Sequence, residues 1–122
     1  MQLVEGSMYE FEPYSELQQR YWTTKYPSEA LMAMMGVVKL ARDKLSAGIE
    51  QPVLVMYAPD DQIVDSEAIQ EKYSRFASDT KTIVAISDSG DPRQHILAGD
   101  ALSPHTTEEV AGHIIRFIRQ LL

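Results

Sequence analysis

The sequence contains no cysteine, which excludes a disulfide framework and any metal site built from cysteine ligands. Basic residues are also scarce, with 11 lysines and arginines against 18 aspartates and glutamates and a formal net charge of -7. The basic residues do not cluster, and a surface that binds phosphates needs a concentrated lysine and arginine patch, so we expect no nucleic acid partner. The same charge balance disfavours binding to an anionic membrane surface.

Long hydrophobic runs are missing as well. The longest apolar stretches, such as 30–35 and 53–58, are far shorter than a membrane span. Residues 1–14 lack the basic start and the apolar centre of a signal peptide. We therefore expect a cytoplasmic protein that has no membrane partner. The histidines are too dispersed along the chain for a metal site, and we expect neither a metal nor a cofactor.

What the chain does contain is the composition of an ordinary globular protein. It has 122 residues, of which 44% are hydrophobic. This is the usual size of one domain, so we expect a single domain over 1–122. The pattern changes near residue 50, and we divide this domain into an N-terminal part, 1–49, and a C-terminal part, 50–122.

The N-terminal part reads as an arm followed by helices. Tyr9 and Phe11 alternate with glutamates, which suits a short strand or an extended arm. Residues 15–26 predict a helix of modest length that a proline ends. Apolar residues at helical spacing predict a second helix over 29–46, with Gly48 as its stop.

The C-terminal part contains two unbroken apolar runs, 52–58 and 82–87, which we predict to be strands. Between them the spacing predicts a helix over about 67–77, capped by Asp65 or Ser66. Strands that are continuously apolar, rather than alternating, are typical of a parallel sheet that is covered on both faces. The order of strand, helix and strand therefore predicts an α/β fold.

A final helix completes the chain. Thr106 and Glu109 have the spacing of a capping box, and apolar residues follow at helical spacing. The two parallel strands form too small a sheet to be stable and leave apolar edges open to water. We therefore expect further strands to come from a second copy, from another polypeptide, or from the N-terminal arm.

Two polar residues follow the predicted strands and are candidates for catalysis. Asp61 lies just beyond the first strand, and His95 lies in the loop after the second. Ligands and catalytic groups collect at this edge of open α/β sheets. A carboxylate beside an imidazole selects its tautomer and stabilises its protonated form. The alternative is that Asp60, Asp61 and Asp65 are turn and capping residues and that His95 has no catalytic role.

The sequence from 52 onward resembles the C-terminal half of an α/β-hydrolase. The segment PVLVMYAPDDQIVD is followed by a helix, a strand, a loop with Arg-Gln-His-Ile-Leu, and a terminal helix. It is most similar to the serine esterases that include monoacylglycerol-lipase-like and serine-aminopeptidase-like enzymes. This resemblance implies that Asp61, rather than Asp60, is the catalytic acid and that His95 is the catalytic histidine. It also implies that 15–46 is part of a helical lid.

The sequence departs from this family in one essential feature. A serine hydrolase needs a nucleophile in a G-x-S-x-G turn, and no serine of this chain has that context. We therefore expect a C-terminal hydrolase fragment that is inactive alone and acts on small acyl esters only when a serine-bearing half complements it. The alternative is a non-catalytic, homo-oligomeric interaction module derived from a hydrolase scaffold.

Overall fold

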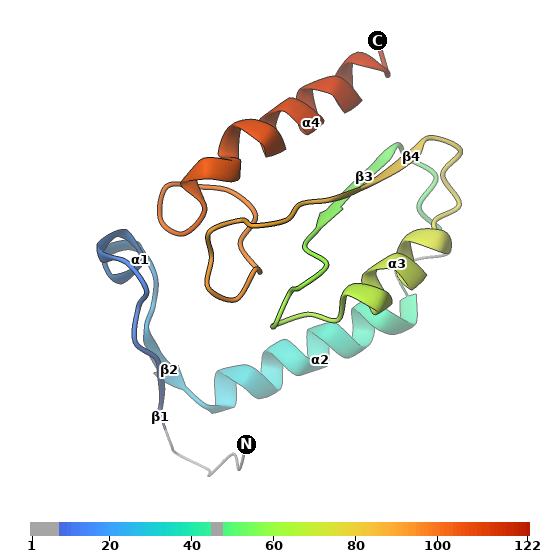
Figure 1. Ribbon diagram of the computed structural model, residues 1–122. Helices are drawn as coiled ribbons and strands as arrows, with labels where there is room; N and C mark the ends of the chain where they lie inside the picture. The colour runs from blue at the N-terminus through green and yellow to red at the C-terminus, as the bar shows by residue number, and fades with distance from the viewer. Residues whose placement is uncertain (1–7, 45–47) are drawn as a thin grey trace. The chain divides into compact units, whose positions relative to one another are not determined.

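The computed structural model of the chain describes residues 8–44 and 48–122. The chain forms two compact units, Met1–Leu45 and Ser46–Leu122, which we call unit 1 and unit 2. Their boundary lies close to the division at residue 49 that the sequence suggests. Figure 1 shows the two units in order, from blue at the N-terminus to red at the C-terminus. Unit 2 combines parallel strands with helices and gives the chain its α/β class.

The described residues of unit 1 form a short antiparallel strand pair and two helices. Its elements are β1 (Met8–Glu10), α1 (Glu16–Tyr21), β2 (Lys25–Pro27) and α2 (Glu29–Lys44). Tyr9 of β1 lies opposite Tyr26 of β2, with ring centroids 5.2 Å apart. Beside them, Lys25 and Glu10 form an ion pair of 3.0 Å across the strands. The alternation around Tyr9 is therefore that of a short strand, one of the two expected forms.

The helix expected over 15–26 is shorter than predicted. Its N-cap is Ser15, whose hydroxyl accepts the N–H of Gln18 at 3.0 Å, but the helix ends at Tyr21. The last residues of the expected helix belong to β2 instead. Pairing with β1 and packing of the tyrosine rings outweigh local helix propensity there, a long-range effect that spacing along the chain does not reveal.

The second expected helix, 29–46, agrees with α2 as far as Lys44. Its expected last residues, 45 and 46, lie outside the described residues. The methionines of α2 are exposed, with 61% of Met32, 52% of Met34 and 52% of Met35 accessible. Within unit 1, α2 therefore presents much of its apolar surface outward.

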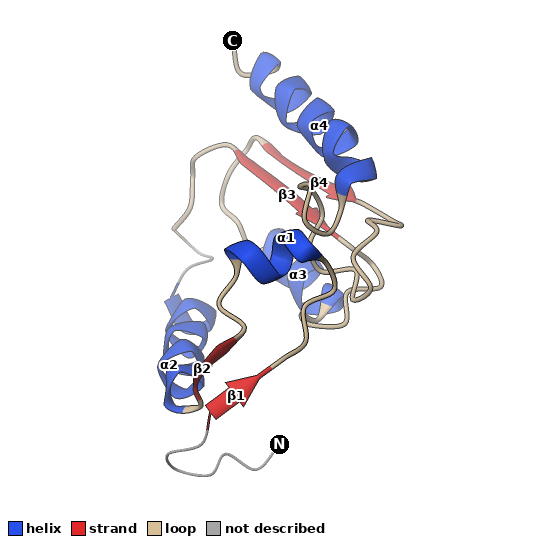
Figure 2. Ribbon diagram, turned by 90° about the vertical axis from the view of Figure 1, so that its left-hand side faces the viewer, coloured by secondary structure: helices blue, strands red, loops and turns tan. Residues whose placement is uncertain are grey.

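Unit 2 is a small parallel α/β structure. Its elements are β3 (Val53–Tyr57), α3 (Ser66–Ser74), β4 (Lys81–Ala85), the 3-10 turn η1 (Pro104–Thr106) and α4 (Thr107–Arg119). The two strands are parallel, with Val53 opposite Lys81 and Tyr57 opposite Ala85. Figures 1 and 2 show α3 and α4 on opposite faces of this strand pair. Both predicted strands and the helix between them are thus confirmed, with ends shifted by one to three residues.

The ends of α3 are held by polar side chains. Asp65 is the N-cap, and its Oδ1 accepts the N–H of Glu67 at 2.9 Å and of Ala68 at 3.2 Å. At the other end, the Nζ of Lys81 donates to the main-chain oxygens of Tyr73, Ser74 and Phe76. A lysine at this position satisfies carbonyls that have no partner inside the helix and opposes the negative end of its dipole.

The capping box expected before α4 is wrong. Thr106 belongs to η1, has helical backbone angles and makes no side-chain capping bond. Its hydroxyl donates instead to the main-chain oxygen of Leu97, at 2.8 Å. Because η1 begins at Pro104 and continues directly into α4, the helical backbone starts before Thr106 and leaves that residue free to hold the preceding loop.

The strand pair of unit 2 has open edges among the described residues, as the sequence leads us to expect. The N–H of Val53 donates to Thr80 and the N–H of Ile86 donates to Tyr57, so alternate residues of β3 direct their backbone groups toward β4. The backbone groups of Leu54, between them, consequently point to the outer edge of β3. A strand edge of this kind is a site where another strand can pair.

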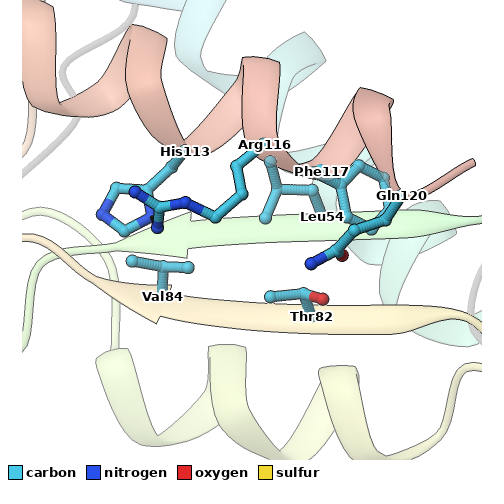
Figure 3. Close-up of a pocket in the computed structure, with 7 residues that line it drawn as sticks. All are labelled: Leu54, Thr82, Val84, His113, Arg116, Phe117 and Gln120. Atoms are coloured by element: carbon cyan, nitrogen blue, oxygen red, sulfur yellow. Dashed lines mark hydrogen bonds between the residues drawn. The ribbon is translucent and has the colours of Figure 1, made fainter.

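A groove of about 180 Å³ lies between α4 and the strand pair. Figure 3 shows Leu54, Thr82 and Val84 forming the strand side of this groove and α4 residues forming the other. On α4, Phe117 is buried, while half of Ile115 and half of Ile118 remain exposed. The helix therefore packs on the strands with one apolar stripe and leaves a second stripe uncovered.

Gly90 is a position where only glycine fits without strain. Its φ is +89°, and a Cβ there would lie against the imidazole of His105. We expect Gly90→Ala to lower the free energy of unfolding by about 2 kcal/mol, mainly through this backbone conformation. Urea denaturation of the full chain measures the change.

The matched control for Gly90 is Gly112, which lies in α4 with nothing near its Cβ position. We expect Gly112→Ala to raise the free energy of unfolding by up to about 1 kcal/mol, because alanine is the better helix former. A Gly90→Ala variant as stable as the wild type would contradict the conformational argument.

Candidate active site

Asp61 lies in the loop between β3 and α3, directly after the turn Pro59–Asp60. Its N–H donates to the carbonyl of Ala58 at 3.3 Å. Its Oδ1 accepts the N–H groups of Ile63 at 2.7 Å and Val64 at 2.9 Å. These bonds fold the loop tightly around the carboxylate, whose side chain is only 5% exposed. The turn role considered from the sequence is therefore real, but it occupies only one of the two carboxylate oxygens.

His95 lies in the long loop between β4 and α4. This loop rests on the loop that carries Asp61, because the N–H of Gln62 donates to the carbonyl of Arg93 at 3.0 Å. Further along, the hydroxyl of Ser103 donates to the carbonyl of Ile96. The loop is thus tied down on both sides of His95 by bonds to its main chain.

The second oxygen of Asp61 meets the imidazole of His95. Oδ2 of Asp61 lies 2.9 Å from Nδ1 of His95, although the two residues are 34 positions apart in the sequence. The structure therefore brings together the two residues that the sequence singles out, at the carboxyl ends of adjacent parallel strands. We call them the Asp61–His95 pair.

The geometry of the pair determines what its imidazole can do. A carboxylate at Nδ1 holds the proton there, which leaves the lone pair of Nε2 to accept a proton from a substrate or a nucleophile. The His95 side chain is 37% exposed, and no described residue bonds to its Nε2. An imidazole with one nitrogen held and the other accessible is arranged for general base catalysis.

The remaining residues considered from the sequence lie outside this pair. Asp65 caps α3, and Asp60 is exposed in the turn. His105 lies against Gly90, and His113 lies on α4, where its Nε2 is 3.9 Å from a carboxylate oxygen of Glu109. Among the described residues, no group of three or more histidines, aspartates or glutamates is placed to hold a metal ion.

The pKa of the Asp61 carboxyl group is lowered. Burial acts in the opposite direction and is the largest single influence on this pKa. Hydrogen bonds from the N–H of Val64, from His95 and from the N–H of Ile63, with the charge of the imidazole, all favour the ionised form and together outweigh burial. Asp61 therefore remains a carboxylate beside the imidazole.

This lowered pKa makes stability depend on pH. The folded state binds a proton at Asp61 less readily than the unfolded chain, where an aspartate has a pKa near 3.9. The stabilisation from the Asp61 carboxylate is complete above that value and is lost as the pH falls through the folded pKa. We expect the difference in unfolding free energy between wild type and Asp61→Asn to shrink as the pH falls from about 5 to 2.

Urea denaturation at a series of pH values measures this difference, and Asp60→Asn controls for the loss of a neighbouring loop carboxylate. A difference between wild type and Asp61→Asn that stays constant on acidification would contradict the bonding described for Asp61.

Sequence reasoning missed the residues that support the site. Asp91 is buried, and its carboxylate accepts the N–H groups of His95 and Ile96. The available signal was an aspartate in a proline-containing loop a few residues before the histidine, since aspartate often bonds to backbone N–H groups that follow it. Thr106, which the sequence predicts as a helix cap, instead bonds to the main chain of this loop at Leu97.

Comparisons of the chain with protein families, with curated proteins and with solved structures found no match. In the part of the chain that the structure describes, no helix is long and apolar enough to cross a membrane. The function of the chain is therefore inferred from the geometry of the Asp61–His95 pair and from the motifs of the sequence itself.

Proposed function

We propose that this chain supplies the acid and the base of a serine ester hydrolase whose nucleophilic serine comes from outside these 122 residues. The observation that carries the proposal is the 2.9 Å contact between Asp61 Oδ2 and His95 Nδ1 at the carboxyl ends of two parallel strands. The order of acid before histidine and the segment 52–65 resemble the C-terminal half of α/β-hydrolases. The lack of a G-x-S-x-G turn in the chain explains why a second segment is required.

In this mechanism His95 transfers protons and Asp61 holds it in place. Nε2 of His95 takes the proton of the serine hydroxyl while the serine oxygen attacks the ester carbonyl carbon. The same nitrogen then gives that proton to the departing alcohol, which leaves an acyl-serine. Water, activated in the same way, releases the carboxylic acid and restores the serine. Asp61 stays ionised throughout and stabilises the imidazolium that forms twice in each cycle.

The substrate class follows from the same resemblance. The serine esterases that this sequence resembles hydrolyse carboxylic esters, so we propose a small acyl ester or an acylglycerol as the substrate of the complete enzyme. The oxyanion that forms during attack needs backbone N–H donors beside the nucleophile, and these come with the serine-bearing segment. This chain contributes the groups that transfer protons, and the serine-bearing segment contributes the oxygen that bonds to the ester carbonyl carbon.

The test joins the two parts in one polypeptide. The nucleophile-bearing half of a serine esterase is fused ahead of residues 1–122, which we call the fused enzyme, and assayed on a short p-nitrophenyl ester. We expect saturable hydrolysis by the fused enzyme and none above the background of free imidazole by either part alone. A fluorophosphonate label reports whether the serine has become reactive. A folded fused enzyme with an unlabelled serine and no hydrolysis would contradict the proposal.

A second candidate function is an oligomeric interaction module without catalysis. The open edge of β3 and the exposed stripe on α4 with Ile115 and Ile118 support it, because self-association would cover both. Light scattering of the full chain distinguishes the two candidates. The module requires a stable homo-oligomer, whereas the hydrolase fragment requires activation by the serine-bearing half. Because the Asp61–His95 pair has no role in such a module, we place the module second to the hydrolase fragment.

A further inference from the structure

Asp91 is the most deeply buried carboxylate near the site, and its exposed fraction is 3%. It makes no bond to the imidazole. Its Oδ2 accepts the N–H of His95 at 3.0 Å and the N–H of Ile96 at 2.8 Å, and its Oδ1 accepts the N–H of Arg93 at 3.1 Å. One side chain therefore binds the main chain of the catalytic candidate and of residues on both sides of it.

The segment between Asp91 and Ile96 is a closed turn, held by main-chain and side-chain bonds. The N–H of Gln94 donates to the carbonyl of Asp91 at 2.9 Å, and Gln94 has a φ of +54°. The amide side chain of Gln94 donates to the same carbonyl at 3.0 Å and accepts the N–H of Ser89 at 3.1 Å. Since Gln94 adopts an unfavourable φ, surrounding bonds must hold the turn in this form.

We propose that Asp91 is a positioning residue: its buried carboxylate holds the main chain of His95 where the imidazole meets Asp61. This inference rests on the proposed function and adds a second carboxylate to the site. Asp61 orients the ring and selects its tautomer, while Asp91 fixes the backbone from which the ring projects. Two carboxylates thus constrain His95, one at its imidazole ring and the other at its main chain.

The chemistry of a carboxylate suits this role better than that of an amide. Hydrogen bonds to an ionised acceptor are shorter and stronger than neutral ones. Both oxygens of Asp91 are used, one by Arg93 and one by His95 and Ile96 together. An asparagine has one acceptor oxygen and would place an N–H₂ group against at least one of these N–H donors.

The contacts of Asp91 also exclude two other roles, those of the catalytic acid and of a metal ligand. It is not the acid that pairs with the imidazole, because Nδ1 of His95 lies against Asp61. It is not part of a metal-binding cluster, since no such cluster of three or more ligands occurs among the described residues. Its bonds to main-chain N–H groups are those of a residue that sets the shape of a turn.

The primary test is nitrogen-15 NMR of the histidine rings in the full chain. We expect the wild type to show a hydrogen-bonded Nδ1 proton for His95 and Asp91→Asn to lose this signal. Asp100→Asn is the matched control, because Asp100 is an exposed carboxylate of the same loop, and it should leave the signal unchanged. A folded Asp91→Asn variant with the wild-type signal would overturn the proposal.

Circular dichroism shows whether each variant is folded. If Asp91→Asn does not fold, Asp91→Glu tests whether Asp91 positions His95. Glutamate keeps the charge and both acceptor oxygens but displaces them by one methylene. We expect the His95 Nδ1 proton to shift in Asp91→Glu. An unshifted signal in this variant would show that the ring is placed without help from Asp91, and the proposal would fail.

Kinetics of the fused enzyme supply a second readout. We expect Asp91→Asn to lower kcat by about 10- to 100-fold with KM changed less than about twofold, because a small displacement of the base affects the reaction and not ester binding. Asp91→Glu should recover part of kcat. If the wild-type fused enzyme is inactive, the proposed function fails, whereas the NMR experiment still decides whether Asp91 positions His95.

Discussion

Replacement of His95 by alanine should reduce kcat of the fused enzyme by about 10⁶-fold, which is the size of effect seen when a triad histidine is removed. Among the described residues no other imidazole meets the Asp61 carboxylate, so none can take the place of His95. Without the imidazole the serine hydroxyl keeps its proton and remains a poor nucleophile. The expected residual rate is that of binding and oxyanion stabilisation alone.

The control for this variant is His113→Gln, since His113 lies on α4 and not in the pair. It should retain kcat within about twofold. Steady-state hydrolysis of a p-nitrophenyl ester gives the rates, and labelling with a fluorophosphonate shows whether the serine has lost reactivity. If His95→Ala kept a tenth or more of the wild-type kcat, the assignment of His95 as the base would be wrong.

Asp61→Asn should lower kcat by about 10⁴-fold, the effect known for the corresponding change in a serine protease triad. The substitution keeps an oxygen that can accept the N–H groups of Ile63 and Val64, so the loop retains its shape. Its amide N–H₂ then faces Nδ1 of His95, where a carboxylate oxygen lies in the wild type. The imidazole must turn its lone pair toward that amide, which places its proton on Nε2 and leaves no acceptor for the serine.

Asp60→Asn is the matched control for Asp61→Asn, because it removes the neighbouring carboxylate with the same change of net charge. It should leave kcat within about twofold of the wild type. Nitrogen-15 NMR of the histidine rings should show the altered tautomer in Asp61→Asn only. Equal losses of kcat in the two variants would mean that the effect comes from the charge of the loop and not from the pair.

The main elements of unit 2 could be predicted because their signals are local. The runs at 52–58 and 82–87 are apolar at every position, and each proved to contain a half-buried parallel strand. The helix end at 21 could not be predicted in the same way. It depends on pairing between β1 and β2. These strands are separated in the sequence, so a local sequence pattern does not reveal that they pair.

The residues of the candidate site also differ in whether local sequence signals could identify them. Asp61 and His95 could be selected because each follows a predicted strand, and the ends of parallel strands meet at one edge of a sheet. Their contact confirms that they converge, while their catalytic roles remain predictions. Asp91 could not be selected, since its importance comes from where the N–H groups of a folded loop happen to point.

Local sequence signals are sufficient to assign the α/β class of unit 2, the parallel direction of its strands, and Asp61 and His95 as candidate site residues. These follow from apolar runs, helix periodicity and the positions of charged residues, all of which are properties of neighbours along the chain. The folded structure was needed to show that one oxygen of Asp61 bonds to a turn and the other to an imidazole, and that Asp91 bonds to the main chain of the same histidine. Such bonds depend on the direction of groups in a folded loop, and the order of residues does not specify that direction locally.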